Sequence, residues 1–85
     1  MNEFVKIARK IGIPDLLNSN RNRENSTARQ AIAYYLKSKG YNEKQIAKMQ
    51  KRSRTTIIHQ IKTFEGLLSV NDILSVEYWE KVNDL

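Results

Sequence analysis

The sequence contains no cysteine, and its only histidine is His59. The lack of cysteine excludes disulfide bonds and thiolate metal sites, and one histidine cannot form a zinc site by itself. We therefore expect no metal site. A chain without cysteine is also compatible with a reducing compartment such as the cytoplasm.

No apolar run approaches the roughly 20 residues that a membrane-spanning helix needs. The N-terminal stretch, which contains Glu3, also differs from a signal peptide, so we expect no membrane partner. Strand patterns, internal repeats and low-complexity segments are missing as well. The 85 residues can form at most one domain, and an apolar fraction of 40% with a charged fraction of 28% is typical of a folded unit.

Acidic residues are scarce in the middle of the chain, where basic residues gather. Between Arg21 and Lys62 there are eleven lysines or arginines and two acidic residues, and the net charge of the whole chain is +6. Residues 71–85 carry a net charge of −3, so residues 1–70 carry +9. This asymmetry favours a surface for a polyanion and a separate acidic end, although scattered surface charge on a soluble protein is the alternative.

Apolar residues recur at helical spacing along the chain, which predicts an all-α fold, a compact bundle of about five to six helices. Thr27 and Gln30 form a capping-box pair, which predicts the start of one helix after a polar loop at residues 18–26. The same logic at Asn42 and Gln45 predicts the start of a helix that ends near Gln50. The other expected helices cover residues 2–11, a short stretch after Pro14, a stretch from Ser53 and residues 71–84.

Residues 46–57 have the layout of a helix-turn-helix. A short helix packs through apolar residues that include Ile46 and Ala47, and a tight turn falls around Lys51 and Arg52. Ser53 then caps a second helix. The first turn of that helix offers side chains of the types that contact bases and phosphates in DNA, namely Arg54, Thr55 and Thr56.

The helix after Ser53 has two distinct faces. Its apolar residues form a stripe that favours burial: Ile57, Ile61, Phe64 and Leu68. Its polar residues lie on the other side at the same spacing: Thr55, His59 and Lys62. A recognition helix needs this division, because one face docks on the protein and the other enters a DNA groove. Gly66 either ends this helix or lies inside it.

Over roughly residues 3–69 the chain resembles the C-terminal DNA-binding domain of the bacterial replication initiator DnaA, a helix-turn-helix domain of the Trp-repressor-like type. The segments that carry the resemblance are the opening helix, Asp15-Leu16-Leu17, the basic loop from Arg21 to Arg23, Ala28-Arg29-Gln30, Ile32-Ala33-Tyr34-Tyr35-Leu36, Ile46-Ala47, and Arg52 to His59. The resemblance implies that Arg21 or Arg23 reaches into the minor groove. It also implies that Arg54, Thr55 and Thr56 meet the major groove and that Lys51 and Arg52 lie near the backbone.

The chain departs from the family at the turn. The family has paired glycines where this sequence has Gln50-Lys51, an aspartate in place of Ser53 and a histidine in place of Arg54. These positions bear on base choice, so we do not assume that this chain recognises the same DNA sequence as the initiator. No glycine-rich phosphate loop for ATP is present, and we expect no cofactor.

We therefore expect sequence-specific binding to double-stranded DNA, with the recognition helix in the major groove and the basic loop near the minor groove. Residues 1–70 would form the helix-turn-helix domain, and residues 71–85 an amphipathic helix packed on the core or at an oligomer interface. The alternative is a transcriptional regulator or a protein-interaction module that forms a homodimer through the last helix.

No catalytic constellation is recognisable, so we expect neither an enzyme nor a small-molecule substrate. DNA binding would associate the protein with the nucleoid in the cytoplasm. The residues expected to contact DNA are Arg21, Arg23, Arg29, Lys48, Lys51, Arg52, Ser53, Arg54, Thr55, Thr56, His59 and Lys62.

Overall fold

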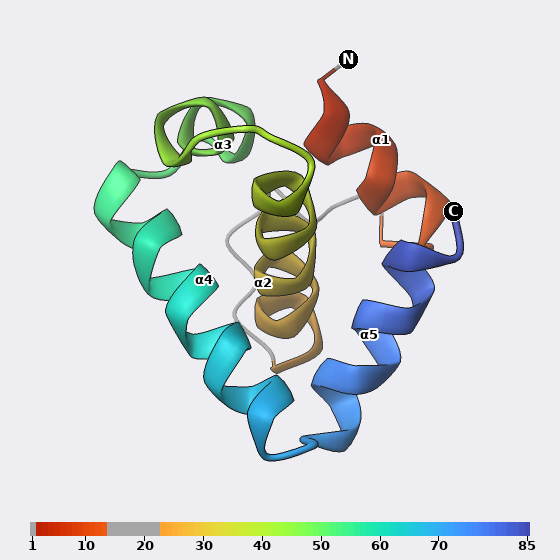
Figure 1. Ribbon diagram of the computed structural model, residues 1–85. Helices are drawn as coiled ribbons and strands as arrows, with labels where there is room; N and C mark the ends of the chain where they lie inside the picture. The colour runs from red at the N-terminus through yellow and green to blue at the C-terminus, as the bar shows by residue number, and fades with distance from the viewer. Residues whose placement is uncertain (1, 14–22) are drawn as a thin grey trace.

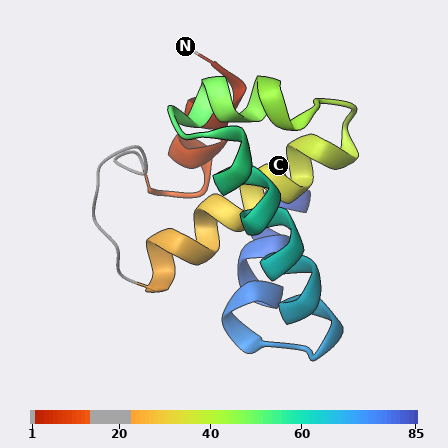
Figure 2. The same ribbon diagram turned by 90° about the vertical axis from the view of Figure 1, so that its left-hand side faces the viewer.

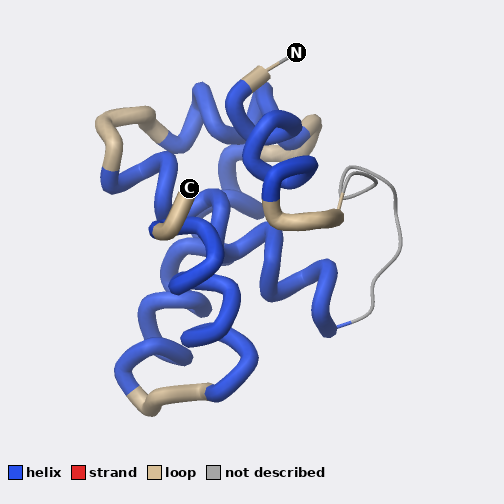
Figure 3. Tube along the Cα trace, turned by 90° about the vertical axis from the view of Figure 1, so that its right-hand side faces the viewer, coloured by secondary structure: helices blue, strands red, loops and turns tan. Residues whose placement is uncertain are grey.

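The computed structural model describes residues 2–13 and 23–85, and within these ranges it contains helices and no strand (Figures 1 and 3). The prediction of an all-α bundle is therefore confirmed. The short helix expected after Pro14 lies outside the described residues. The five helices are α1 (Glu3–Lys10), α2 (Arg23–Ser38), α3 (Glu43–Gln50), α4 (Arg54–Ser69) and α5 (Ile73–Asn83).

Helix α2 lies at the centre of the bundle and contacts each of the other four helices (Figure 1). Its buried residues are mostly small: Ala28, Ala31 and Ala33 are fully buried, together with Ile32. Alanine side chains allow neighbouring helix axes to approach closely, since the distance between packed helices depends on the side chains at the contact. The alanines of α2 therefore let several helices pack around one central helix.

Helix α2 begins at Arg23, four residues before the predicted cap at Thr27, so that prediction is wrong. Thr27 is inside the helix and only 3% exposed. Glu24 is favourable in the first turn because of the helix dipole, and Arg23 forms an ion pair with Asp72. A capping motif reflects local bonds alone, whereas this burial and this long-range ion pair stabilise an additional helical turn.

Helix α5 packs on α2 and α4 of the same chain. Tyr78 and Val82 are buried on its inner side, and the Trp79 ring lies 5.1 Å from that of Tyr34 and 5.9 Å from that of Phe64, centroid to centroid. The steep angles between these rings are those that aromatic pairs prefer. The aromatic cluster thus joins α2, α4 and α5. Among the described helices, none has the length and apolar character needed to cross a membrane.

Candidate nucleic-acid interface

Helix α3 ends in a tight turn at the position where the sequence predicts one. Lys51 has the left-handed backbone conformation, with φ of 57°, and the Arg52 N–H donates to the Ala47 carbonyl at 3.0 Å. This bond is typical of a helix C-terminus in which glycine usually takes the left-handed position. A lysine in that conformation costs about 1–2 kcal/mol relative to its ordinary backbone conformation.

Ser53 caps α4, as the sequence predicts. Its hydroxyl oxygen accepts a hydrogen bond from the Thr56 N–H at 3.2 Å. The hydroxyl groups of Ser53 and Thr56 also share a hydrogen bond, with 2.9 Å between their oxygens. Thr56 is half-buried, so its side chain serves this local cap. Arg54 and Thr55, between the two capping residues, are exposed. The first turn of α4 contains no acidic residue, and its N–H groups and helix dipole favour an anion there.

The two faces predicted for α4 are present. Ile57 and Phe64 are fully buried, and Ile61 and Leu68 are half-buried. Thr55, His59 and Lys62 are exposed, and so is Thr63, one turn beyond His59. Sequence reasoning missed Thr63, although its spacing of four from His59 places it on the same face.

Basic side chains from α3 and the turn extend this exposed face. Lys48 and Lys51 are exposed and Arg52 is partly exposed. Together with the outer residues of α4, these side chains form one surface, which we call the α3–α4 basic surface. Figure 2 shows the molecule from the side on which α4 and the turn between α3 and α4 lie. The α3–α4 basic surface consists of Lys48, Lys51, Arg52, Arg54, Thr55, His59 and Lys62.

Glu43, in the first turn of α3, is paired with a cation. Its carboxylate lies 2.7 Å from the Lys37 ammonium group, and the hydrogen bond from Lys37 holds the pKa of Glu43 below its usual range. A backbone hydrogen bond and the more distant charge of Arg54 act in the same direction. The pair leaves little net negative charge at the start of α3.

Polar bonds from two directions hold the C-terminal end of α3. The Asn2 side-chain amide donates to the Met49 carbonyl at 3.0 Å, while its oxygen caps α1 by accepting from the Val5 N–H at 2.9 Å. The side-chain amides of Gln50 and Gln60 donate to each other, both at 2.8 Å. Sequence reasoning missed these contacts, because no spacing rule relates side chains of separate helices.

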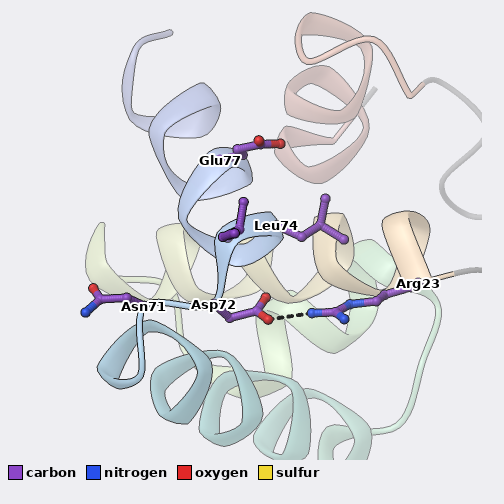
Figure 4. Close-up of a pocket in the computed structure, with 6 residues that line it drawn as sticks. Arg23, Asn71, Asp72, Leu74 and Glu77 are labelled. Atoms are coloured by element: carbon purple, nitrogen blue, oxygen red, sulfur yellow. Dashed lines mark hydrogen bonds and ion pairs between the residues drawn. The ribbon is translucent and has the colours of Figure 1, made fainter.

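Arg23 lies at the other end of α4. Its guanidinium group is 2.6 Å from the Asp72 carboxylate (Figure 4). This carboxylate also caps α5 by accepting from the Ser75 N–H and hydroxyl. Helix α4 is about 24 Å long at 1.5 Å per residue, and it separates Asp72 from Arg54. The structure therefore does not bring Arg23 together with the α3–α4 basic surface. Arg21 lies outside the described residues.

Arg29 requires a correction. The sequence predicts it at the DNA-contacting surface, but it is 7% exposed on α2. Because α2 is surrounded by the other helices, residues on most of its sides face the protein rather than solvent. Its position removes Arg29 from the α3–α4 basic surface.

A second surface feature is a shallow hollow of about 550 Å³ beside the ion pair of Arg23 and Asp72. Leu74 and Glu77 of α5 also line it (Figure 4). Its two carboxylates outnumber its one cation, so it does not suit a polyanion. Within residues 2–13 and 23–85, no group of three or more histidine, cysteine, aspartate or glutamate residues could hold a metal ion.

Comparison with known protein families, with curated proteins and with solved structures gave no significant match to this chain.

Asp72 gives the chain a testable dependence on pH. Hydrogen bonds from Arg23, then from Ser75, hold the pKa of Asp72 below its usual range. Ionised Asp72 therefore stabilises the folded chain near neutral pH, and this contribution is lost as the pH falls through the folded-state pKa. We expect the melting temperature to be higher for the wild type than for Asp72→Asn near pH 7, with the difference shrinking below about pH 4.

The asparagine variant keeps an N-cap of similar quality, so the comparison isolates the charge. Glu80→Gln, a change at an exposed carboxylate of the same helix, is the matched control and should show a smaller difference at every pH. If the difference between wild type and Asp72→Asn stayed constant down to pH 2, the ion pair would not be its cause.

Proposed function

We propose that this chain binds double-stranded DNA, with α3 and α4 acting as a helix-turn-helix and α4 as the recognition helix in the major groove. The observation that carries the proposal is the division of α4. Its apolar side is buried at Ile57 and Phe64, while its outer side presents Arg54, Thr55 and His59 from a capped N-terminus. A helix that enters a groove needs this arrangement.

The side chains of the α3–α4 basic surface divide by the kind of contact that each can make. Arg54 and Thr55 project from the first turn of α4, where recognition helices contact base edges, and arginine pairs well with guanine. Lys48, Lys51 and Arg52 lie beside that turn and would contact phosphates, which position the protein without reading sequence. His59 and Lys62 continue the outer face along the groove.

The strained backbone of Lys51 also supports the proposal. Glycine would take the left-handed conformation without a steric penalty, so a lysine at this position lowers stability. Strained residues tend to occur at functional sites, where another property of the side chain is needed. A cation beside the N-terminus of the recognition helix would provide that property by contacting a phosphate.

The proposal retains the resemblance to the DNA-binding domain of DnaA over roughly residues 3–69. The minor-groove contact that the resemblance implies for the basic loop then falls to Arg21, because Arg23 pairs with Asp72. Arg29 has no part in the proposed DNA contact. Association with the nucleoid would follow from DNA binding, in replication or in transcription.

Dimerisation through the last helix is the competing proposal. Tyr78 and Val82 are buried within this chain, so the inner side of α5 is not available to a second copy. The arrangement of α5 therefore favours DNA binding by a single chain over an α5-mediated dimer.

Replacing Arg54 and Thr55 separately tests the proposed contacts. Thr55→Ala should lower the preference for a duplex that the wild type selects from a random pool, since a lost base contact costs about 1–3 kcal/mol. Arg54→Ala should also reduce the slope of log affinity against log salt by about one unit. Fluorescence anisotropy with labelled duplexes at several salt concentrations measures both effects.

Arg9→Ala is the matched control, because it removes the same charge from an exposed site on α1. Its binding should change less than that of Arg54→Ala at each salt concentration. An Arg54→Ala variant that behaved like Arg9→Ala would contradict the assignment of α4 to the groove.

Lys51→Gly should separate stability from binding. Relief of the left-handed strain raises the free energy of unfolding. The greater conformational freedom of glycine in the unfolded chain lowers it by a smaller amount. The free energy of unfolding should therefore rise by about 0.5–1 kcal/mol. DNA affinity should fall, and the salt slope should drop by about one unit as a phosphate contact is lost. Urea denaturation and duplex titration give the two quantities.

Asn71→Gly provides the control, since Asn71 has a similar φ of 56° in the turn between α4 and α5. Asparagine tolerates this conformation, so the gain in stability should be smaller, and DNA binding should not change. Undiminished DNA affinity in Lys51→Gly would exclude Lys51 from the interface.

A further inference from the structure

The pair formed by Gln50 and Gln60 is a polar contact between α3 and α4. Gln50 is the last residue of α3 and is 1% exposed, and Gln60 is half-buried in the middle of α4. Each side-chain amide donates to the oxygen of the other at 2.8 Å, which closes a ring of two hydrogen bonds. The pair satisfies one donor and one acceptor on each side chain.

A ring of two hydrogen bonds is directional in a way that apolar packing is not. The other residues buried near this contact include Ile46, Ala47 and Ile57, whose side chains can shift against one another at modest cost. The amide pair tolerates little change in distance or rotation, because hydrogen bonds weaken steeply away from linear geometry. Buried polar contacts of this type can select one arrangement among several that bury similar apolar area.

The location of the pair connects it to the α3–α4 basic surface. Gln50 directly precedes Lys51, and Gln60 is six residues from Arg54, or about 9 Å along α4. If the axis of α4 tilted by about 20° about the amide pair, the start of the helix would therefore move by about 3 Å. Such a shift exceeds the tolerance of a hydrogen bond to a base edge.

We propose that Gln50 and Gln60 are positioning residues that fix α4 against α3 and thereby set the base preference of the protein. This inference rests on the proposed binding of DNA by the α3–α4 basic surface. The pair itself does not touch DNA. It aligns Arg54 and Thr55 with bases while Lys48 and Lys51 contact the phosphates, so its loss should affect selectivity more than overall attraction to DNA.

The test replaces both amides in the variant Gln50→Met/Gln60→Met. Methionine is unbranched and close to glutamine in size, and replacing both partners leaves neither amide buried without a partner. The measured quantity is the ratio of affinities for a duplex selected by the wild type and for a scrambled duplex of equal length. We expect this ratio to fall about tenfold, the loss of roughly one base contact, with an unchanged salt slope and unchanged helix content by circular dichroism.

Val82→Ala is the control for stability alone, because Val82 is fully buried on α5 and distant in sequence from the α3–α4 turn. That variant should melt at a lower temperature and keep the wild-type affinity ratio. Should the double variant not fold, Gln50→Leu/Gln60→Leu, which also removes both amides and leaves neither one buried without a partner, is measured in the same way.

The outcomes separate this inference from the proposed function. A folded variant that lacks the amide pair and keeps the wild-type affinity ratio would overturn the positioning role while leaving DNA binding intact. A wild-type chain that binds no duplex at low salt would overturn the proposed function, and the positioning role with it. A reduced ratio with an unchanged salt slope supports the inference.

Discussion

Burial of α2 on several sides is the constraint on which the rest of the structure depends. A domain of this size needs most of its apolar residues in one core, and α2 provides the surface on which they meet. Its small alanine side chains allow α4 and α5 to pack closely against it. The rings of Tyr34, Phe64 and Trp79 pack against one another between the three helices. Because α4 must turn Phe64 inward to complete this core, its opposite face is left to solvent. The exposed face of the proposed recognition helix is thus a consequence of how the core closes.

The two ends of α4 differ in charge and in surroundings. At its start, a serine cap and neighbouring cations surround a helix N-terminus, which favours anions. Beyond its end, Asp72 caps α5 and binds Arg23, and the exposed side of α5 carries Glu77 and Glu80. The separation keeps the acidic helix away from the surface proposed for phosphates, where like charges would repel DNA.

Local signals in the sequence predicted the elements that depend on local bonds. The capping box of Asn42 and Gln45, the cap at Ser53 and the two faces of α4 are all present in the structure. The tight turn expected around Lys51 and Arg52 is also present, and the structure adds that Lys51 has the left-handed conformation there, where glycine is the usual residue. Gly66, whose role the sequence left open, lies inside α4 because flanking residues on both sides hold the helix against the core.

The features that the sequence did not predict depend on contacts between separate helices. The motif of Thr27 and Gln30 fits a helix start, but the ion pair of Arg23 with Asp72 joins residues 49 apart and extends α2 past it. Burial of Arg29 follows from the central place of α2, which no local pattern reveals. The amide pair of Gln50 and Gln60 likewise depends on how α3 and α4 meet. These contacts decide which predicted residues share a surface. The sequence therefore predicted which residues of α4 belong to the candidate site, but it did not predict which residues outside α4 join them.

The central claim, that DNA contacts the chain at the start of α4, is tested most directly by following backbone amide resonances during titration of the labelled protein with a duplex. Binding at the α3–α4 basic surface predicts the largest shifts at residues 51–56, with further shifts near His59 and Lys62 and small ones in α5. The largest shifts in α5, or no shifts at low salt with duplex in excess, would contradict it.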